Sequence, residues 1–301
     1  MNEIIEVNQP EMLQAQSRAD IDAQVATAHA YPRDLQQVLN KIETLATMDK
    51  ETAEDCFYVL RRKDRNGNDS VIEGLSVRMA EIIASAWGNL RIATHIVGND
   101  GRMLTAQAVC HDLESNVAIC KEVKRSIVTK TGATFSQDMQ VVTGNAASAI
   151  AFRNAVLAVI PKAVTKRIVN NIRTVALGQS IDLETSRQNV MQYFAKLGVS
   201  QEQLFYYLEV GSAQEIDKQK IFELRATANA IKEGTTTVAE TFVKPMQEAK
   251  RQEEAAKHAD DAKGRAAAAI AKATGATVDT ETGEIFQLAA EGKKTSKTAK
   301  K

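Results

Sequence analysis

The chain has 301 residues, with 38 basic and 38 acidic side chains and an apolar fraction of 44%. This length and apolar content allow one large domain or two modest ones with a real core. No apolar run approaches the roughly 18 residues of a membrane-spanning helix, and the acidic start MNEIIEVNQPEM lacks the basic and apolar regions of a secretory signal.

The first part of the chain predicts an arm, a helix and a β-hairpin. Residues 1–31 are polar and lack firm periodicity, so we expect a flexible acidic arm. Pro32 fits the first turn of a helix, and apolar residues recur at helical spacing after it. FYVLRRK at 57–63 is typical of a strand, Asn66-Gly67 of a hairpin turn, and 70–73 of the returning strand.

A helix and a three-stranded meander are expected next. Residues 75–87 have helical periodicity, and Gly88 supplies the left-handed residue at which a helix can end. Turn residues at 98–101 and 114–116 then separate three strand-like runs, which are 90–97, 102–113 and 117–128. The sequence therefore predicts an antiparallel β-meander in addition to the hairpin.

The remainder of the chain predicts helices. A helix runs from Asp138 to Ile160, and Pro161 separates it from a second helix that Gly178 closes. Shorter helices are expected at 185–197, 201–208 and 218–233. The Ala-, Lys- and Glu-rich stretch from 243 predicts a helical extension, and the basic end GKKTSKTAKK predicts a flexible tail. The expected fold class is α+β, with meander and hairpin packed against long helices and a small helical C-terminal region.

Charge is distributed unevenly along the chain. Residues 1–56 hold 4 basic against 11 acidic side chains, a net −7, whereas residues 57–178 hold 16 against 9, a net +7. A local excess of this kind attracts a polyanion, most commonly nucleic acid, although a solvated basic surface is the alternative. The candidate DNA-binding residues are Arg61, Arg62, Lys63, Lys121, Lys124, Arg125, Lys130, Arg153, Lys162, Lys166, Arg167 and Arg173.

The helix 138–160 has two unusual features. One of its halves carries only small or neutral polar residues, from Gln140 to Ala158, where a solvent-facing surface would carry Lys and Glu. Such a face suits either a tight contact with another helix or a sheet, or a close approach of nucleic acid. Arg153 falls in the apolar half, so its guanidinium needs a partner: a carboxylate such as Asp138 or Glu81, backbone carbonyls, water or an external phosphate.

Neither the cysteines nor a search for catalytic motifs indicates an active site. If Leu113 pairs with Val117, Cys110 lies opposite Cys120, although a slip of one residue separates them. Three cysteines without CxxC spacing predict free thiols in a reducing, cytoplasmic compartment. The sequence contains no GxxxxGK[ST], GxSxG or HExxH motif, so we expect neither an enzyme nor a cofactor or metal.

Three segments resemble a known family. The strand–turn–strand FYVLRRKDRNGNDSVIEG, the helix ending in Trp87-Gly88 with the meander, and the Ala-rich helix GNAASAIAFRNAVLAVIPKAV together resemble phage single-strand annealing proteins of the RecT/Redβ type. In that family an Ala-x-Arg helix lines the DNA groove, and Ala151, Arg153 and Pro161 match its pattern. The resemblance covers roughly 33–178. This helix carries fewer basic residues than is usual there, and most of its positive charge follows Pro161.

The resemblance implies ATP-independent binding of single-stranded DNA and annealing of complementary strands in phage-type recombination. It also implies a homo-oligomer in the form of a ring or filament, with a host single-strand-binding protein and a phage exonuclease as further partners. Trp87, Phe135 and Phe152 could stack on bases, or else belong to the core. Two other functions stay open: a passive single-strand-binding protein, and a structural oligomer whose basic segment is a subunit interface.

The expected organisation has four regions: a flexible acidic arm at 1–31, a DNA-binding and annealing core at 32–178, a helical accessory domain at 179–242, and a helical extension with a disordered basic tail at 243–301.

Overall fold

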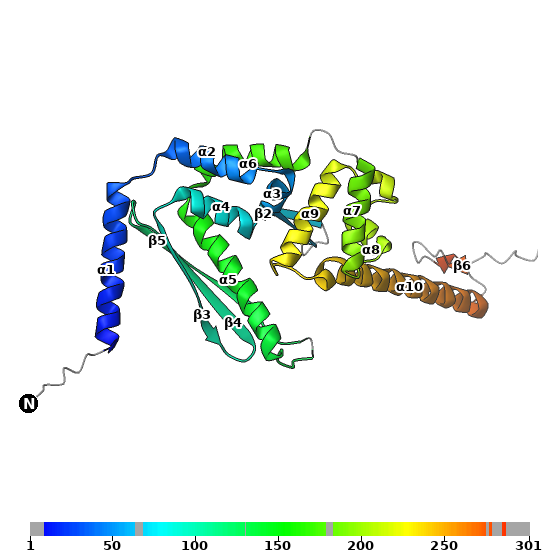
Figure 1. The fold of residues 1–301 in the computed structure, drawn as a ribbon. Helices are drawn as coiled ribbons and strands as arrows, with labels where there is room; N and C mark the ends of the chain where they lie inside the picture. The colour runs from blue at the N-terminus through cyan, green and yellow to red at the C-terminus, as the bar shows by residue number, and fades with distance from the viewer. Residues whose placement is uncertain are drawn as a thin grey trace, which may run out of the picture. The chain divides into compact units, whose positions relative to one another are not determined.

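A computed structural model describes residues 9–63, 69–129, 131–178, 183–274, 277–278 and 285–286. The fold is mixed α+β and contains antiparallel sheets and long helices, as the sequence predicts (Figure 1). Residues 1–242 form one compact unit, and residues 243–301 form a second. The second unit contains the helix α10 (Lys244–Thr274) and the short paired strands β6 (Thr277–Val278) and β7 (Ile285–Phe286).

The N-terminal part of the first unit is more helical than the sequence suggests. Helix α1 (Gln9–Ala30) occupies most of the segment expected to be a flexible arm. Helix α2 (Leu35–Ala46) begins after the cap residue Asp34, whose carboxylate accepts hydrogen bonds from two amides of the first turn. Helix α3 (Lys50–Asp55), which the sequence did not predict, precedes the first hairpin.

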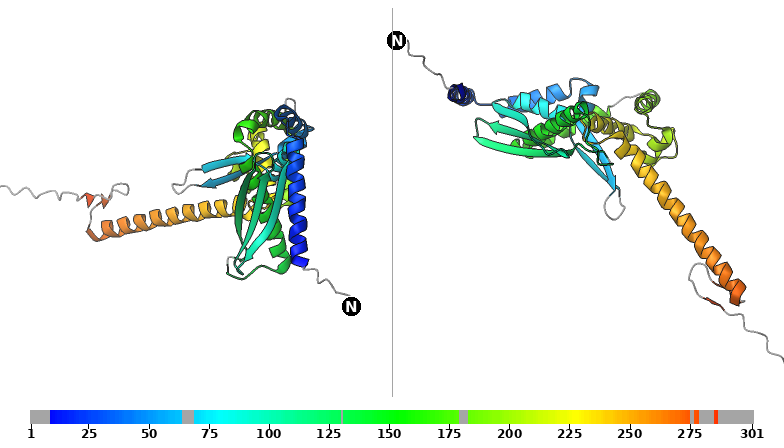
Figure 2. Two further views of the ribbon diagram at one scale, coloured as in Figure 1. Left: turned by 90° about the vertical axis from the view of Figure 1, so that its left-hand side faces the viewer. Right: turned by 90° about the horizontal axis from the view of Figure 1, so that it is seen from below.

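The hairpin and the meander form separate antiparallel sheets (Figure 2). Strands β1 (Phe57–Lys63) and β2 (Asp69–Leu75) pair along their whole length, while the predicted turn at Asn66-Gly67 lies outside the described residues. Helix α4 (Val77–Trp87) follows and ends at Gly88, whose φ is +66°. The meander consists of β3 (Leu90–Asn99), β4 (Met103–Asp112) and β5 (Val117–Ser126), in the order β3-β4-β5.

The register of the meander separates two cysteines. Asp112, not Leu113, pairs with Val117, so Cys110 lies opposite Ile119 and Val109 lies opposite Cys120. This slip of one residue places the two thiols on opposite faces of the sheet, because side chains alternate along a strand. Cys110 is buried and Cys120 is exposed, so of the two registers that the sequence left open the structure has the one that separates the thiols.

Helix α5 (Gln137–Val159) lies along the meander (Figure 1). Gly144, Ala147, Ala151 and Ala155 are buried, and a Cβ at Gly144 would lie 3.5 Å from Leu104 Cδ1 of β4. The facing side of β4 is also small, with Ala106 and Ala108 fully buried. Of the two interpretations of the small face, the tight helix–sheet contact is therefore the one that the structure shows.

Helix α6 (Lys162–Leu177) follows α5 after a bend of 116° at Ile160 and Pro161. Its buried residues pack against α2 and α3, and Gly178 ends it with a φ of +66°. In the part of the chain that the structure describes, no single helix has both the length and the apolar content to cross a membrane; α5 and α6 satisfy both only when they are taken together.

The last part of the first unit is a helical cluster. It consists of α7 (Leu183–Lys196), α8 (Gln201–Leu208), the 3-10 turn Ala213–Glu215, α9 (Lys218–Lys232) and the π-helical segment Ala239–Val243. Helix α9 belongs to both hydrophobic clusters of the unit. Phe222 and Ala226 join the core that contains α5 and β4, whereas Ile221 and Leu224 join the core of the helical cluster.

Candidate nucleic-acid interface

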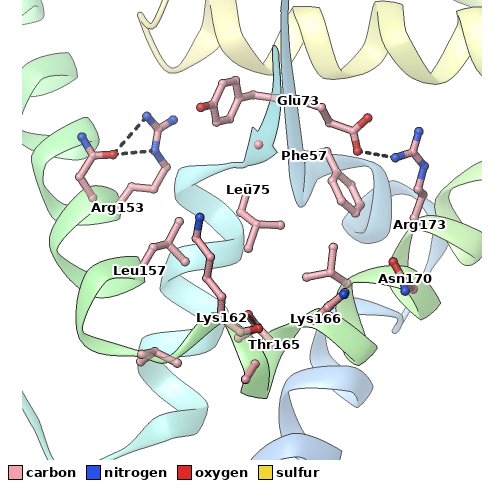
Figure 3. Close-up of a pocket in the computed structure, with 16 residues that line it drawn as sticks. Phe57, Glu73, Leu75, Arg153, Leu157, Lys162, Thr165, Lys166, Asn170 and Arg173 are labelled. Carbon is pink, nitrogen blue, oxygen red and sulfur yellow. Dashed lines mark hydrogen bonds and ion pairs between the residues drawn. The ribbon is translucent and has the colours of Figure 1, made fainter. Parts of the chain in front are cut away.

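A groove lies where the α5–α6 bend faces the β1–β2 hairpin. It has a volume of about 760 Å³ and is lined by residues of β1, β2, α5 and α6 (Figure 3). The bend produces the groove, because Pro161 ends α5 and directs α6 beneath the hairpin. Four of the twelve candidate cations line it, Arg153, Lys162, Lys166 and Arg173, against the single acidic lining residue Glu73. The described lining therefore has an excess of three positive charges.

The cations of the groove on α6 differ in whether they pair with a carboxylate. Lys162 and Lys166 are exposed, and neither pairs with a carboxylate among the described residues. Arg173 donates to Glu73 Oε1 at 2.7 Å (Figure 3). Its guanidinium also stacks over the Phe222 ring at 5.4 Å. The two lysines are thus available for an external anion, whereas Arg173 already has a partner from β2.

Arg153 is buried in the wall of the groove. Only 5% of its surface is exposed, and its guanidinium carbon lies 4.5 Å from the centre of the Tyr58 ring. Its Nη1 lies 3.6 Å from Glu233 Oε2, and its Nε and Nη2 lie 3.4 Å from Asn154 Oδ1. An internal carboxylate was one of the possible partners of Arg153 that the sequence analysis named. The structure supplies one, but it is Glu233, just after α9, and neither Asp138 nor Glu81.

The position of the Tyr58 ring depends on the lack of a side chain at Gly74 on the opposite strand. Tyr58 pairs with Gly74 in the hairpin, and a Cβ at Gly74 would lie 2.6 Å from Cε1 of the ring. Real contacts are never this short, so only glycine at 74 lets the ring lie across β2. The tyrosine then supports the Arg153 guanidinium through a cation–π contact.

Two other predicted cations are engaged inside the protein. Arg61 forms ion pairs with Glu223 and Glu209 and stacks over the Tyr207 ring. Its hydrogen bond to Glu223 raises the pKa of Arg61, and burial only partly offsets this effect. Arg125 donates to the carbonyl oxygens of Gly234 and Thr235, just beyond α9. Both guanidinium groups join the helical cluster to the sheets.

The other candidate cations lie apart from the groove. Lys121 and Lys124 are exposed on β5, and Arg167 is exposed on α6 outside the lining. The side chains of Arg62 and Lys63, which belong to β1, and the whole of Lys130 lie outside the described residues.

Sequence reasoning missed Tyr58, Glu73 and Glu233. The predicted hairpin contained a signal for the first two, because pairing of its strands brings Tyr58 and Glu73 to the same end. No local pattern pointed to Glu233. The three aromatics proposed for stacking, Trp87, Phe135 and Phe152, all pack against the first hydrophobic core.

Within the described residues, no cluster of three or more His, Cys, Asp or Glu side chains is arranged to hold a metal ion. Comparison with protein-family models, with curated proteins and with solved structures found no match to this chain.

Proposed function

We propose that the protein binds single-stranded DNA in the α5–α6 groove and anneals complementary strands without ATP. The observation that carries the proposal is the groove itself, where the buried Arg153 and two lysines that pair with no carboxylate among the described residues gather around one cavity. Lysine and arginine contacts hold the phosphate backbone without reading sequence, which is the requirement for pairing arbitrary complementary strands. Annealing needs no covalent step, so we propose that the protein is not an enzyme.

The resemblance of residues 33–178 to annealing proteins of the RecT/Redβ type supports the same function. On that basis we also propose a cytoplasmic phage recombination protein that forms a ring or filament. A host single-strand-binding protein and a phage exonuclease are the partners that the resemblance suggests.

Binding and annealing are tested separately. If about four cations neutralise phosphates, the slope of log affinity against log salt should be near −3, so affinity for a single strand falls roughly fiftyfold between about 50 and 200 mM salt. Mixing two complementary labelled oligonucleotides with the protein, without nucleotide, should then accelerate duplex formation.

The two alternative functions predict different results. A passive single-strand-binding protein would bind with the same salt dependence but would not accelerate pairing. A structural oligomer would bind neither strand, and this result would remove the proposal.

A further inference from the structure

The ion pair between Arg153 and Glu233 is incomplete. Nη1 of the arginine and Oε2 of the glutamate are both buried, lie 3.6 Å apart, and have no hydrogen-bond partner among the described residues. A good charge-assisted hydrogen bond between such groups measures about 2.7–2.9 Å. The guanidinium therefore has unused donor capacity in a site from which bulk solvent is largely excluded.

The pair stands between two cavities. Arg153 lines the groove described above. Glu233 lines a second cavity of about 480 Å³ between α4, α5 and the end of α9, together with Arg78 and Glu81. A guanidinium at this position can face either the carboxylate on one side or an anion in the groove on the other.

Glu233 is the fixed member of the pair. Its Oε1 accepts a hydrogen bond of 2.6 Å from the Val77 amide at the start of α4. The next residue, Gly234, has a φ of +69°, and a Cβ there would lie 2.6 Å from Ala146 Cβ, so the backbone sits tightly against α5. Arg125 holds the carbonyl oxygens of Gly234 and Thr235. These contacts hold the Glu233 carboxylate in its place beside α4.

We propose that Glu233 restrains Arg153 in the free protein and that a phosphate of the bound strand replaces Glu233 as the partner of this guanidinium. The inference rests on the proposed function, because it names a regulator of the same groove. A phosphate offers oxygens that can accept two hydrogen bonds from one guanidinium, which Glu233 at its fixed distance does not. Glu233 is thus a positioning residue that sets the affinity of the groove.

The surroundings of Glu233 make this restraint sensitive to protonation. Burial raises the pKa of the Glu233 carboxyl, and the Val77 amide and Arg153 only partly offset this effect. The charged groups around it are Arg153 from α5, Arg78 and Glu81 from α4, Asp55 from α3, and Lys232 from α9. Since a protonated Glu233 no longer attracts Arg153, lowering the pH should release the guanidinium and strengthen binding.

The test uses the full chain and a labelled 20-nucleotide oligothymidylate, with affinity followed by fluorescence anisotropy. Glu233→Gln retains an oxygen for the Val77 amide but removes the charge that restrains Arg153. We expect it to bind roughly fivefold more tightly than the wild type, with a log–log salt slope steeper by up to about 0.7. Glu81→Gln, which removes one charge from the same cavity without a contact to Arg153, is the matched control and should change affinity less than about twofold.

Two further measurements tie the effect to Arg153. In an Arg153→Gln background, Glu233→Gln should no longer increase affinity. The gain in wild-type affinity between about pH 8 and pH 5.5 should shrink in Arg153→Gln, a comparison that does not require the Glu233 variant to fold.

The outcomes separate the two proposals. The restraint by Glu233 is wrong if the wild type binds the oligonucleotide but Glu233→Gln binds no more tightly than Glu81→Gln. It is also wrong if the Glu233→Gln gain and the pH-dependent gain are unchanged in the Arg153→Gln background. In both cases the proposal that the groove binds single-stranded DNA still stands. If the wild type does not bind at all, the proposed function itself is wrong.

Discussion

Arg33 and Asp112 form a two-pronged ion pair across 79 residues of sequence, with Nη1 donating to Oδ2 at 2.5 Å and Nη2 to Oδ1 at 2.6 Å. Trp87 completes the arrangement, because the guanidinium stacks over its ring at 4.6 Å and its indole Nε1 donates to Asp112 Oδ2 at 3.1 Å. The segment before α2, the end of α4 and the end of β4 thus meet at one buried carboxylate.

Asp112→Asn should lower the free energy of unfolding by about 1.5–3 kcal/mol, because it weakens the two-pronged contact of the largely buried Arg33 guanidinium and leaves Glu114, 2.9 Å from Nε, as its remaining charged partner. Urea unfolding at pH 7 measures this change. The exposed pair of Arg78 and Glu81 is the matched control, and Glu81→Gln should cost less than about 1 kcal/mol.

Acid should erase the difference between the wild type and Asp112→Asn. Burial by itself would raise the pKa of Asp112, but hydrogen bonds from Arg33 and Trp87 and the charge of Arg33 together hold it well below its usual range. A depressed carboxyl pKa contributes stability that is present above the unfolded value of about 3.9 and is lost as the pH falls toward the folded value. A constant difference between pH 5 and pH 2 would contradict this role.

The groove lysines should matter more for DNA than the lysines of the sheet. Replacing Lys162 and Lys166 together with Gln removes the two groove cations that have no carboxylate partner in the described part of the chain, and we expect affinity for a single strand to fall about ten- to a hundredfold at about 100 mM salt. Replacing Lys121 and Lys124 on β5 changes the net charge equally and is the control. Equal losses in the two double variants would show that binding follows overall charge and not the groove.

Thiol reactivity should distinguish the three cysteines. Burial raises the pKa of Cys56 to about 12 and that of Cys110 to about 11, whereas Cys120 is exposed on β5. Because the thiolate is the reactive form, an aromatic disulfide reagent at pH 8 should label Cys120 quickly and the other two only after unfolding. Cys120→Ser should abolish the fast phase. Fast labelling of Cys110 in the folded protein would contradict the register of β4 with β5.

Gly234→Ala should destabilise the first unit by about 2–5 kcal/mol. Alanine is strained at a φ of +69°, and its Cβ would collide with Ala146 Cβ at 2.6 Å. Gly264→Ala in α10 is the same chemical change where no atom lies within 4 Å, so it should leave the melting temperature of the first unit unchanged. A variant at Gly234 as stable as the wild type would show that the end of α9 can shift away from α5.

Much of the secondary structure could be predicted because its signals are local. Alternating strands with turn residues between them gave the meander, and Gly88 and Gly178 mark helix ends with φ of +66° in both cases. Helix α3 was missed because a segment of six residues with one apolar side chain, Ala53, carries almost no periodic signal. The register of β4 with β5 stayed open because the turn after β4 did not fix which residue pairs with Val117.

The partners of the cations could not be predicted. Arg61 meets Glu223 across 162 residues, and Arg225 pairs with Glu54 across 171. These pairs form only when α9 packs against β1 and α3 in the folded protein. A count of basic residues in the sequence therefore overestimates the positive charge that is free to attract DNA. Of the cations from 57 to 178, Lys162 and Lys166 are those that the structure leaves unpaired in the described groove.

Helix α9 gives its residues to two hydrophobic cores at once. If α9 moves away, apolar side chains of both cores become exposed to water. The two cores should therefore melt together as one cooperative transition. The helical cluster is therefore not a module that evolution could exchange freely. A recombinant fragment that stops before Lys218 would lack part of the interior that the meander itself requires.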